Sequence, residues 1–229
     1  MHKIISKFIS DTFYEGNLLD ADDIVDKTIT EPCLKHPAFQ PFTFYDIESE
    51  EGFDKNSFFN DEQIFLIIEI YKAMKEIYSL QQISERLAII SPYSNQVYKI
   101  KETLKIIEGR DDCPVEVNTV DGFQGKEKNI IIFSTVRSIG SKSVGFLSDE
   151  RRMNVGLSRA KSCLIVIGDS KKLITDKNWE KLVKYSFRNG TFYKVKGKVK
   201  TFWDKFKINE SKYLVRNEEE FVRSVYSQK

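Results

Sequence analysis

Apolar positions follow two different spacings along most of the chain. Short continuous apolar runs, such as 87–91 and 163–168, predict buried strands, whereas apolar positions three and four residues apart, as in 61–78, predict amphipathic helices. Strands and helices of these kinds alternate, which predicts an α/β fold with a mostly parallel sheet covered by helices on both faces. The predicted strands are 42–47, 87–91, 115–120, 129–136, 163–168 and an edge strand at 191–195, and the predicted helices are 1–14, 61–78, 94–107, 150–160 and 179–187.

Local signals set the ends of some of these elements. Asn60 or Asp61 can cap the helix that follows, and Gly109 is expected to end the helix that begins near Ser94. Residues 20–60 are acidic and contain three prolines, so apart from the strand at 42–47 they are expected to form loops. Ligands of parallel sheets bind beyond the carboxyl ends of the strands, which here are the loops after Ser91, Val120, Val136 and Gly168.

The C-terminal part has a different character. From Lys194 the chain becomes basic and aromatic without a clear period, so we divide it into an α/β domain at 1–195 and an extension at 196–229. A nucleic-acid patch in 194–207 is one interpretation, but a solvated edge strand with inward-facing aromatic rings is favoured. Residues 218–229 are expected to form either one more helix or a frayed tail.

Composition narrows the possible functions only slightly. The 36 basic and 34 acidic side chains give a net charge of +2, so any contact with nucleic acid has to come from local patches. The three cysteines are far apart in the sequence and there are only two histidines. We therefore expect no disulfide framework, no metal site and no catalytic Ser-His pair. The longest apolar run is too short for a bilayer, and no signal peptide is recognised, so the cytoplasm or the nucleus is expected.

Two segments have a composition suited to phosphate binding. In Thr119–Glu127 two nearby glycines allow close backbone approach, and Gln124 and Glu127 offer polar side chains for a phosphate or a sugar. An ordinary glycine turn is the competing interpretation. In Asp149–Lys161, a continuous helix would place Arg152 and Arg159 two turns apart on one face, where guanidinium groups can bind oxyanions. A solvated basic face is the alternative there.

A missing motif is equally informative. The sequence has no GxxxxGK[ST] phosphate loop, and Asp149-Glu150 precedes two arginines instead of ending a buried strand, which makes it a poor magnesium ligand. The chain therefore has residues that can contact phosphates but lacks the loop that encloses them. A Rossmann-type dinucleotide enzyme is disfavoured because no GxGxxG follows the first strand.

Four blocks in order resemble the superfamily 1B helicases of the Upf and senataxin branch. They are Met1-His2 through Leu18, Ala88-Ile89-Ile90-Ser91-Pro92-Tyr93 through Gln96, Val120-Asp121-Gly122-Phe123-Gln124-Gly125-Lys126-Glu127, which is similar to motif V, and Gly145 through Lys161, which is similar to motif VI. The resemblance covers about residues 1–190. It implies the second RecA-like domain, which closes over ATP and Mg²⁺ held mainly by a first domain.

The resemblance also implies roles for individual residues. Arg159 would be the arginine finger that reaches the γ-phosphate. Gln124 and Arg152 are weaker choices as site residues, and the resemblance implies a network role for them. Gly125 would offer its backbone amide to the γ-phosphate, and Glu127 would bond the ribose hydroxyls. Single-stranded RNA or DNA would cross the opposite side of the domain, at a set of six residues: Ser91, Pro92, Tyr93, Thr119, Thr135 and Arg137.

Two departures from the family pattern affect these expectations. The family has an arginine before its Met-His pair, which is absent here, and Lys3 replaces the usual proline. The leading hypothesis is the C-terminal half of an ATP-dependent helicase, monomeric, acting in RNA surveillance or transcription termination and inactive without its first domain. The alternative is a naturally truncated, non-catalytic module that binds RNA or protein.

Overall fold

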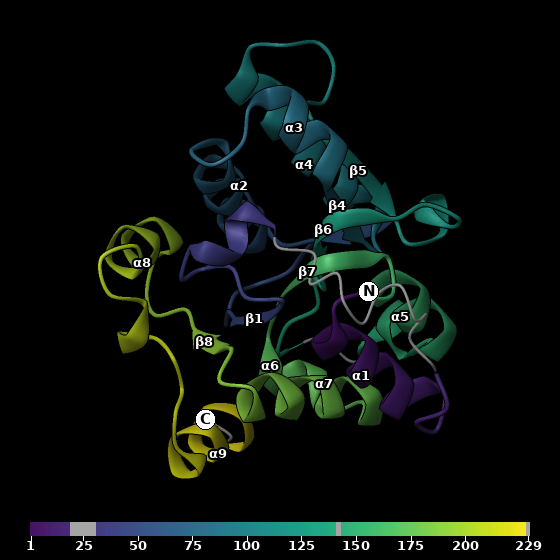
Figure 1. The fold of residues 1–229 in the computed structure, drawn as a ribbon, viewed down its shortest axis with the longest axis vertical. Coiled ribbons are helices and arrows are strands. Elements are labelled where there is room, and N and C mark those ends of the chain that lie inside the picture. The colour runs from purple at the N-terminus through teal and green to yellow at the C-terminus, as the bar shows by residue number, and fades with distance from the viewer. Residues whose placement is uncertain (19–30, 141–142, 228–229) are drawn as a thin grey trace.

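The computed structural model describes residues 1–18, 31–140 and 143–227. Within these ranges six strands form one sheet in the order β5-β4-β6-β7-β1-β8, and every neighbouring pair is parallel (Figure 1). The strands are β1 (Phe42–Asp46), β4 (Leu87–Ser91), β5 (Glu116–Thr119), β6 (Lys128–Ser134), β7 (Ala160–Gly168) and β8 (Phe192–Lys194). The predicted parallel α/β fold is confirmed.

Helices cover both faces of the sheet, which lies between them in Figure 1. On one side are α2 (Asp61–Lys75), α3 (Leu80–Arg86) and α4 (Ser94–Glu108); on the other are α1 (Lys3–Phe13), α5 (Glu150–Leu157), α6 (Ser170–Leu173) and α7 (Lys177–Arg188). Successive strand residues point to opposite faces, so Ile132 and Ile165 join the first core while Ile131 and Leu164 join the second. All four are fully buried, which stabilises the fold by about 1.5–3 kcal/mol for each side chain.

The predicted helix boundaries follow from caps. The Asn60 side chain accepts a hydrogen bond from the Gln63 amide at 3.1 Å, which satisfies one of the free donors at the start of α2. Gly109 ends α4 with φ of +61°, a left-handed conformation that favours glycine. Both predictions are confirmed.

Three parts of the fold differ from the sequence-based expectations. The helix α5 ends at Leu157, so Arg159 does not lie on it as predicted. A short hairpin, β2 (Gly52–Asp54) with β3 (Ser57–Phe59), occupies part of the predicted loop 20–60, while 19–30 lies outside the described residues. The helix α3 also was not predicted.

The C-terminal part forms helices instead of a solvated strand. Residues 199–206 form α8, and its Val199, Phe202, Trp203 and Phe206 are buried against the first core, so the inward-facing aromatics are confirmed and the strand is wrong. A last helix, α9 (Glu218–Tyr226), follows. No helix in the three described ranges has the length and apolar character needed to cross a bilayer.

Candidate functional site

The glycine segment 120–127 runs from the carboxyl end of β5 to the amino end of β6. We call the side of the sheet where the parallel strands end the carboxyl edge, and the side where they begin the amino edge. The segment leaves β5 after Thr119, which pairs with Ser91 at the carboxyl end of β4, and it enters β6, whose Ile130 pairs with Leu87 at the amino end of β4. Thr119, directly before the segment, lies at a carboxyl end of the sheet. Gly125 and Glu127 lie at the amino edge.

Buried side chains fix the course of this segment. Val120 and Phe123 are buried in the second core, and the Asn118 side-chain amide donates to the Gly122 carbonyl at 3.0 Å. A Cβ on Gly122 would lie 2.3 Å from the Asn118 oxygen, so any other residue would displace the Asn118 side chain and its hydrogen bond. Gly125 has φ of +75° and open space around it, and among the described residues its amide has no hydrogen-bond acceptor. The segment thus presents a free amide donor to solvent.

Arg159 lies between the end of α5 and the start of β7, beside this segment. Its guanidinium donates to the Val155 carbonyl at 2.9 Å, to the Ser158 hydroxyl at 2.9 Å and to the Lys126 carbonyl at 3.4 Å. These acceptors are all neutral, and no carboxylate pairs with Arg159 in the part of the chain that the structure describes. The guanidinium is therefore positioned next to the glycine segment with its charge uncompensated.

Arg152 has a different environment. It donates twice to the Asp121 carboxylate, at 3.1 and 3.0 Å, and lies 5.2 Å from the ring centroid of Phe146. Its charge is compensated, so it fits the network role better than the role of a phosphate ligand. Glu127 is exposed, with the Lys161 ammonium 3.6 Å away, and Gln124 is exposed as well.

The first predicted block also reaches the amino edge. The His2 amide donates to the Lys161 carbonyl at 2.6 Å, two residues after Arg159, and the Asn154 side chain donates to the Tyr14 hydroxyl at 3.0 Å. Figure 1 shows the N-terminus close to α5 and β7. Blocks that are far apart in sequence therefore meet around Arg159.

At the carboxyl edge, four of the six predicted nucleic-acid residues have buried side chains. Ser91 and Thr135 are fully buried, and Tyr93 and Arg137 are 2% and 5% exposed. Thr135 donates to the Ile167 carbonyl at 3.1 Å, and Tyr93 donates to the Val144 carbonyl at 3.2 Å. Burial raises the pKa of Tyr93, so its hydroxyl stays protonated as a donor.

The carboxyl edge leaves few side-chain groups free for a ligand. Arg137 forms an ion pair with Glu51 at 3.1 Å, which uses its charge internally. Pro92 and Thr119 are only partly buried, and the Thr119 hydroxyl accepts from the Gly122 amide at 3.1 Å. A nucleic-acid strand at this edge would meet Pro92, Thr119 and backbone groups, since the other predicted side chains have partners within the protein.

Sequence reasoning missed three charged residues near these sites. Asp121 holds Arg152, Lys161 pairs with Glu127, and Lys126 pairs with Glu116 at 2.6 Å. The sequence shows Asp121 near the start of the glycine segment, Lys126 next to Glu127, and Lys161 two residues after Arg159. Their pairing depends on the crossover from β5 to β6, which the sequence did not show.

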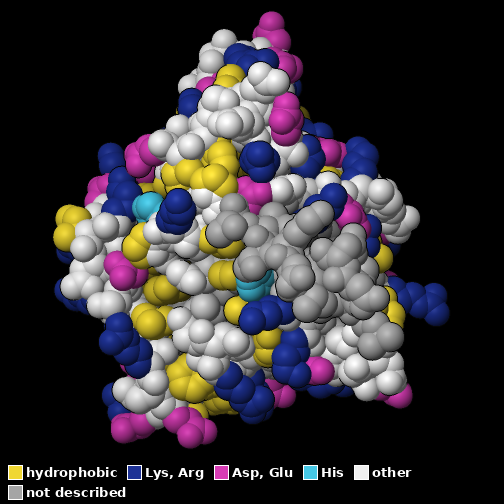
Figure 2. Space-filling model, in the orientation of Figure 1, with side chains coloured by type: hydrophobic (Ala, Val, Ile, Leu, Met, Phe, Trp, Pro, Cys, Tyr) yellow, Lys and Arg dark blue, Asp and Glu magenta, His cyan; other side chains and the backbone are white. Residues whose placement is uncertain are grey.

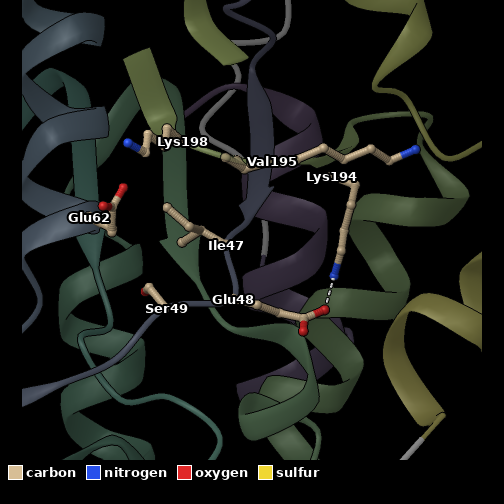
Figure 3. A pocket seen from close by; sticks show the side chains of 9 residues that line it. Ile47, Glu48, Ser49, Glu62, Lys194, Val195 and Lys198 are labelled. Carbon is tan, nitrogen blue, oxygen red and sulfur yellow. Dashed lines mark hydrogen bonds and ion pairs between the residues drawn. The ribbon is translucent and has the colours of Figure 1, made fainter. Parts of the chain in front are cut away.

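A separate hollow of about 490 Å³ lies at the carboxyl ends of β1 and β8 (Figure 3). Lys194 points to Glu48 there, with 2.7 Å between the charged atoms, and also contacts the buried Asp46 at 2.6 Å. Burial alone would lower the pKa of Lys194, but these carboxylates raise it, so the cation is kept. None of the predicted site residues lines this hollow.

Charges on the viewed face are mixed. Figure 2 shows basic and acidic side chains interspersed over that face, without one dominant basic area. This agrees with the small net charge of +2 and indicates that a polyanion would be held by local groups.

Comparisons with known proteins identify relatives of the whole arrangement. A family model described as an AAA domain, AAA_12, matches residues 1–171. The probable helicase MAGATAMA 3 of Arabidopsis thaliana is 38% identical over 217 residues, which cover 93% of this chain and 26% of that protein. Helicase SEN1 of Saccharomyces cerevisiae is 39% identical over 191 residues, covering 80% of this chain and 8% of that protein.

A third relative is the regulator of nonsense transcripts 1 of Dictyostelium discoideum, 32% identical over 199 residues, or 82% of this chain and 14% of that protein. Among solved structures, the C-terminal domain of a possible DNA helicase from Lactobacillus plantarum aligns with a TM-score of 0.44 at 10% identity, covering 79% of this chain and 91% of that chain. The chain spans about a quarter or less of the length of these relatives. The chain belongs to the AAA_12 family and to the superfamily 1B helicase branch that includes Sen1, senataxin and the regulator of nonsense transcripts.

Proposed function

We propose that this chain is the second RecA-like domain of an ATP-driven helicase and supplies its arginine finger, Arg159. The observation that carries the proposal is the uncompensated guanidinium held beside the glycine segment by neutral acceptors only. An arginine fixed in this way can stabilise charge that develops on a transferring phosphoryl group at a domain interface.

The residues at the amino edge fit one side of a nucleoside triphosphate. The free, exposed Gly125 amide can donate to a phosphate oxygen, because its left-handed backbone and open surroundings allow close approach. Glu127, exposed near Lys161, can accept from ribose hydroxyls. ATP with Mg²⁺, when bound, supplies the phosphoryl group; the phosphate loop and the metal ligands belong to the first RecA-like domain, which is the proposed partner.

The relatives support the wider assignment. The chain corresponds to a small part of proteins named as helicases, so we propose that it acts within one polypeptide with a first domain, as a monomer, on single-stranded RNA or DNA. A relative named as a regulator of nonsense transcripts favours RNA surveillance as the setting. The proposed location is the cytoplasm or the nucleus.

The direct test is Arg159→Ala in the protein that joins this chain to its first domain. Loss of an arginine finger costs about 10³–10⁵-fold in turnover, so ATP hydrolysis should fall by this range while oligonucleotide affinity stays nearly unchanged. Arg188→Ala is the matched control, since Arg188 is exposed on α7, away from the glycine segment. Equal loss of hydrolysis and binding in Arg159→Ala would refute the finger.

The chain by itself provides a second test. We expect no measurable ATP hydrolysis from the isolated chain, since its sequence has no phosphate loop. RNA-stimulated turnover by the purified chain would overturn this expectation. The naturally truncated module that binds RNA or protein is the alternative, and a gene that encodes no first RecA-like domain beside this chain would favour it.

A further inference from the structure

We propose that the exposed rings of Phe53 and Phe146 are stacking platforms for the bases of single-stranded nucleic acid at the carboxyl edge. This inference rests on the proposed helicase function and adds residues to its nucleic-acid site. Phe53 lies on the β2–β3 hairpin and Phe146 lies in η3 (Gly145–Ser148), and their side chains are 61% and 57% exposed.

The two rings end one continuous chain of aromatic contacts. Phe53 packs on Phe58 with centroids 4.8 Å apart, Phe58 on Tyr93 at 5.8 Å, and Tyr93 on Phe146 at 6.0 Å. The inner ring of Tyr93 is buried and bonded to Val144, whereas both outer rings keep open surfaces. Since Tyr93 follows the carboxyl end of β4, the chain of rings runs along the edge where the nucleic-acid residues were predicted.

Hydrogen bonds attach the hairpin that carries Phe53 to α4. The turn residues of the hairpin, Lys55 and Asn56, have φ of +50° and +57°, the backbone of a tight two-residue turn. Asn95 lies in the first turn of α4. Its backbone N–H donates to the Ser57 hydroxyl at 3.2 Å, and its side-chain amide donates to the Asp54 carbonyl at 3.0 Å. These bonds anchor the hairpin that carries Phe53 to α4, and an anchored support lowers the entropic cost of binding.

Cations accompany the rings, but most of them are already paired. The guanidinium of Arg137 lies 4.0 Å from the Phe58 ring centroid and pairs with Glu51, and that of Arg152 lies near Phe146 and pairs with Asp121. Lys55 lies over Tyr98 at 4.1 Å. Local charge is thus nearly balanced. Contacts to bases, which are sequence-tolerant, should therefore contribute more here than contacts to phosphates.

The size of the effect follows from measured stacking energies. Stacking of one base on an aromatic side chain contributes about 1–3 kcal/mol, so removing one ring should weaken binding by about 5–150-fold. Because the platform is close to electrically neutral, the salt dependence of binding should keep its slope when a ring is removed.

The experiment uses the two-domain protein with Phe53→Ala and Phe146→Ala. Phe65→Ala is the matched control, because Phe65 is 60% exposed on α2 and has no ring contact among the described residues. Binding of a fluorescent oligouridylate and of an abasic oligomer of equal length is measured by anisotropy. We expect both platform variants to bind the oligouridylate at least five-fold more weakly, with the control unchanged and all variants equal on the abasic strand.

Three other results would overturn the proposal. Unchanged oligouridylate binding would show that the rings do not contact bases. Equal weakening on both strands would show that the rings support the backbone path or the first domain instead. Failure of the wild-type protein to bind either strand would overturn the proposed function itself, which separates the two claims. Both platform rings are more than half exposed, so unfolding midpoints should stay near wild type and confirm that the variants fold.

Discussion

The two edges of the sheet differ in how they use their polar groups. At the amino edge the Gly125 amide, the Glu127 carboxylate and the Arg159 guanidinium are accessible and incompletely paired. At the carboxyl edge Thr135 and Arg137 are buried and bonded to internal partners. The same parallel sheet therefore carries one edge whose polar groups can bind a ligand and one whose polar groups hold the fold.

This difference bears on how motif residues are interpreted. A polar residue after a parallel strand can contact a ligand, or it can satisfy the backbone groups left free where the strands end. Thr135, directly after β6, shows the second case, since its hydroxyl donates to the Ile167 carbonyl at 3.1 Å. Substitutions at the carboxyl edge should therefore lower stability more than ligand binding. Substitutions at the amino edge should lower ligand binding more than stability.

The largest stability effect is expected at the carboxyl edge, for Arg137→Ala. The Arg137 and Glu51 side chains are only 7% and 13% exposed, and removing one partner of a buried pair costs about 3–5 kcal/mol. The variant also loses the guanidinium that packs on the Phe58 ring. Urea unfolding monitored by circular dichroism measures the change in unfolding free energy.

An exposed pair in the same molecule calibrates this prediction. Arg152 and Asp121 are 36% and 55% exposed, so Arg152→Ala should change the unfolding free energy by less than about 1 kcal/mol. Similar losses in the two arginine variants would contradict the expected difference between a buried and an exposed ion pair.

The next effect concerns pH and Asp169, which follows β7 at the carboxyl edge. Burial, and to a lesser extent the nearby Asp46, raise the pKa of Asp169 to about 6, although amides of Ile139 and Lys172 act against this shift. A carboxyl whose pKa is raised on folding favours the native state when protonated. Its contribution to stability is therefore present below the unfolded value of 3.8 and is lost as pH rises to about 6.

The variant Asp169→Asn isolates this contribution. The shift of roughly two pH units corresponds to about 3 kcal/mol, so wild type should lose up to this amount relative to the variant between pH 4 and 6.5. Unfolding free energies of both proteins across this range give the difference. A constant difference would show that Asp169 titrates normally in the folded protein.

Much of the fold was predictable, because strand and helix signals agreed with one another. The strand Leu87–Ser91 was predicted with its observed ends, and Gly109 marked the end of α4. The prediction that Arg159 lies on the helix was wrong for a physical reason. No glycine or proline separates Leu157 from Ala160, so the periodic pattern continued, whereas in the structure the Arg159 carbonyl already accepts from the Lys128 amide beside β7.

Other elements were missed despite signals in the sequence. Val199, Phe202, Trp203 and Phe206 have the spacing of a helical apolar face, and α8 buries all four. The hairpin turn at Lys55-Asn56 lacks the glycine that normally marks it. For the candidate site, sequence motifs identified the accessible residues, but the burial of Ser91 and Thr135 depends on long-range packing that no local pattern encodes.

The smallest expected effect is at Gly125, on the amino edge. Its φ of +75° strains any residue with a Cβ, but the space around it is open, so Gly125→Ala should lower the unfolding free energy by only about 1–2 kcal/mol. Gly125→Asn should cost less, because asparagine tolerates the left-handed conformation. Differential scanning calorimetry of the three proteins measures these differences.

The same pair of variants separates conformation from chemistry at this edge. Both substitutions keep the backbone amide, so if that amide binds a phosphate, hydrolysis by the two-domain protein should follow backbone strain and fall more in Gly125→Ala than in Gly125→Asn. At Gly122, where a Cβ would lie 2.3 Å from the Asn118 oxygen, alanine and asparagine should be equally harmful, because the clash arises from space and not from φ. If alanine and asparagine were also equally harmful to hydrolysis at Gly125, the size of the side chain and not the backbone φ would decide the loss. The space around Gly125 would then have to fill when the two domains meet over the nucleotide.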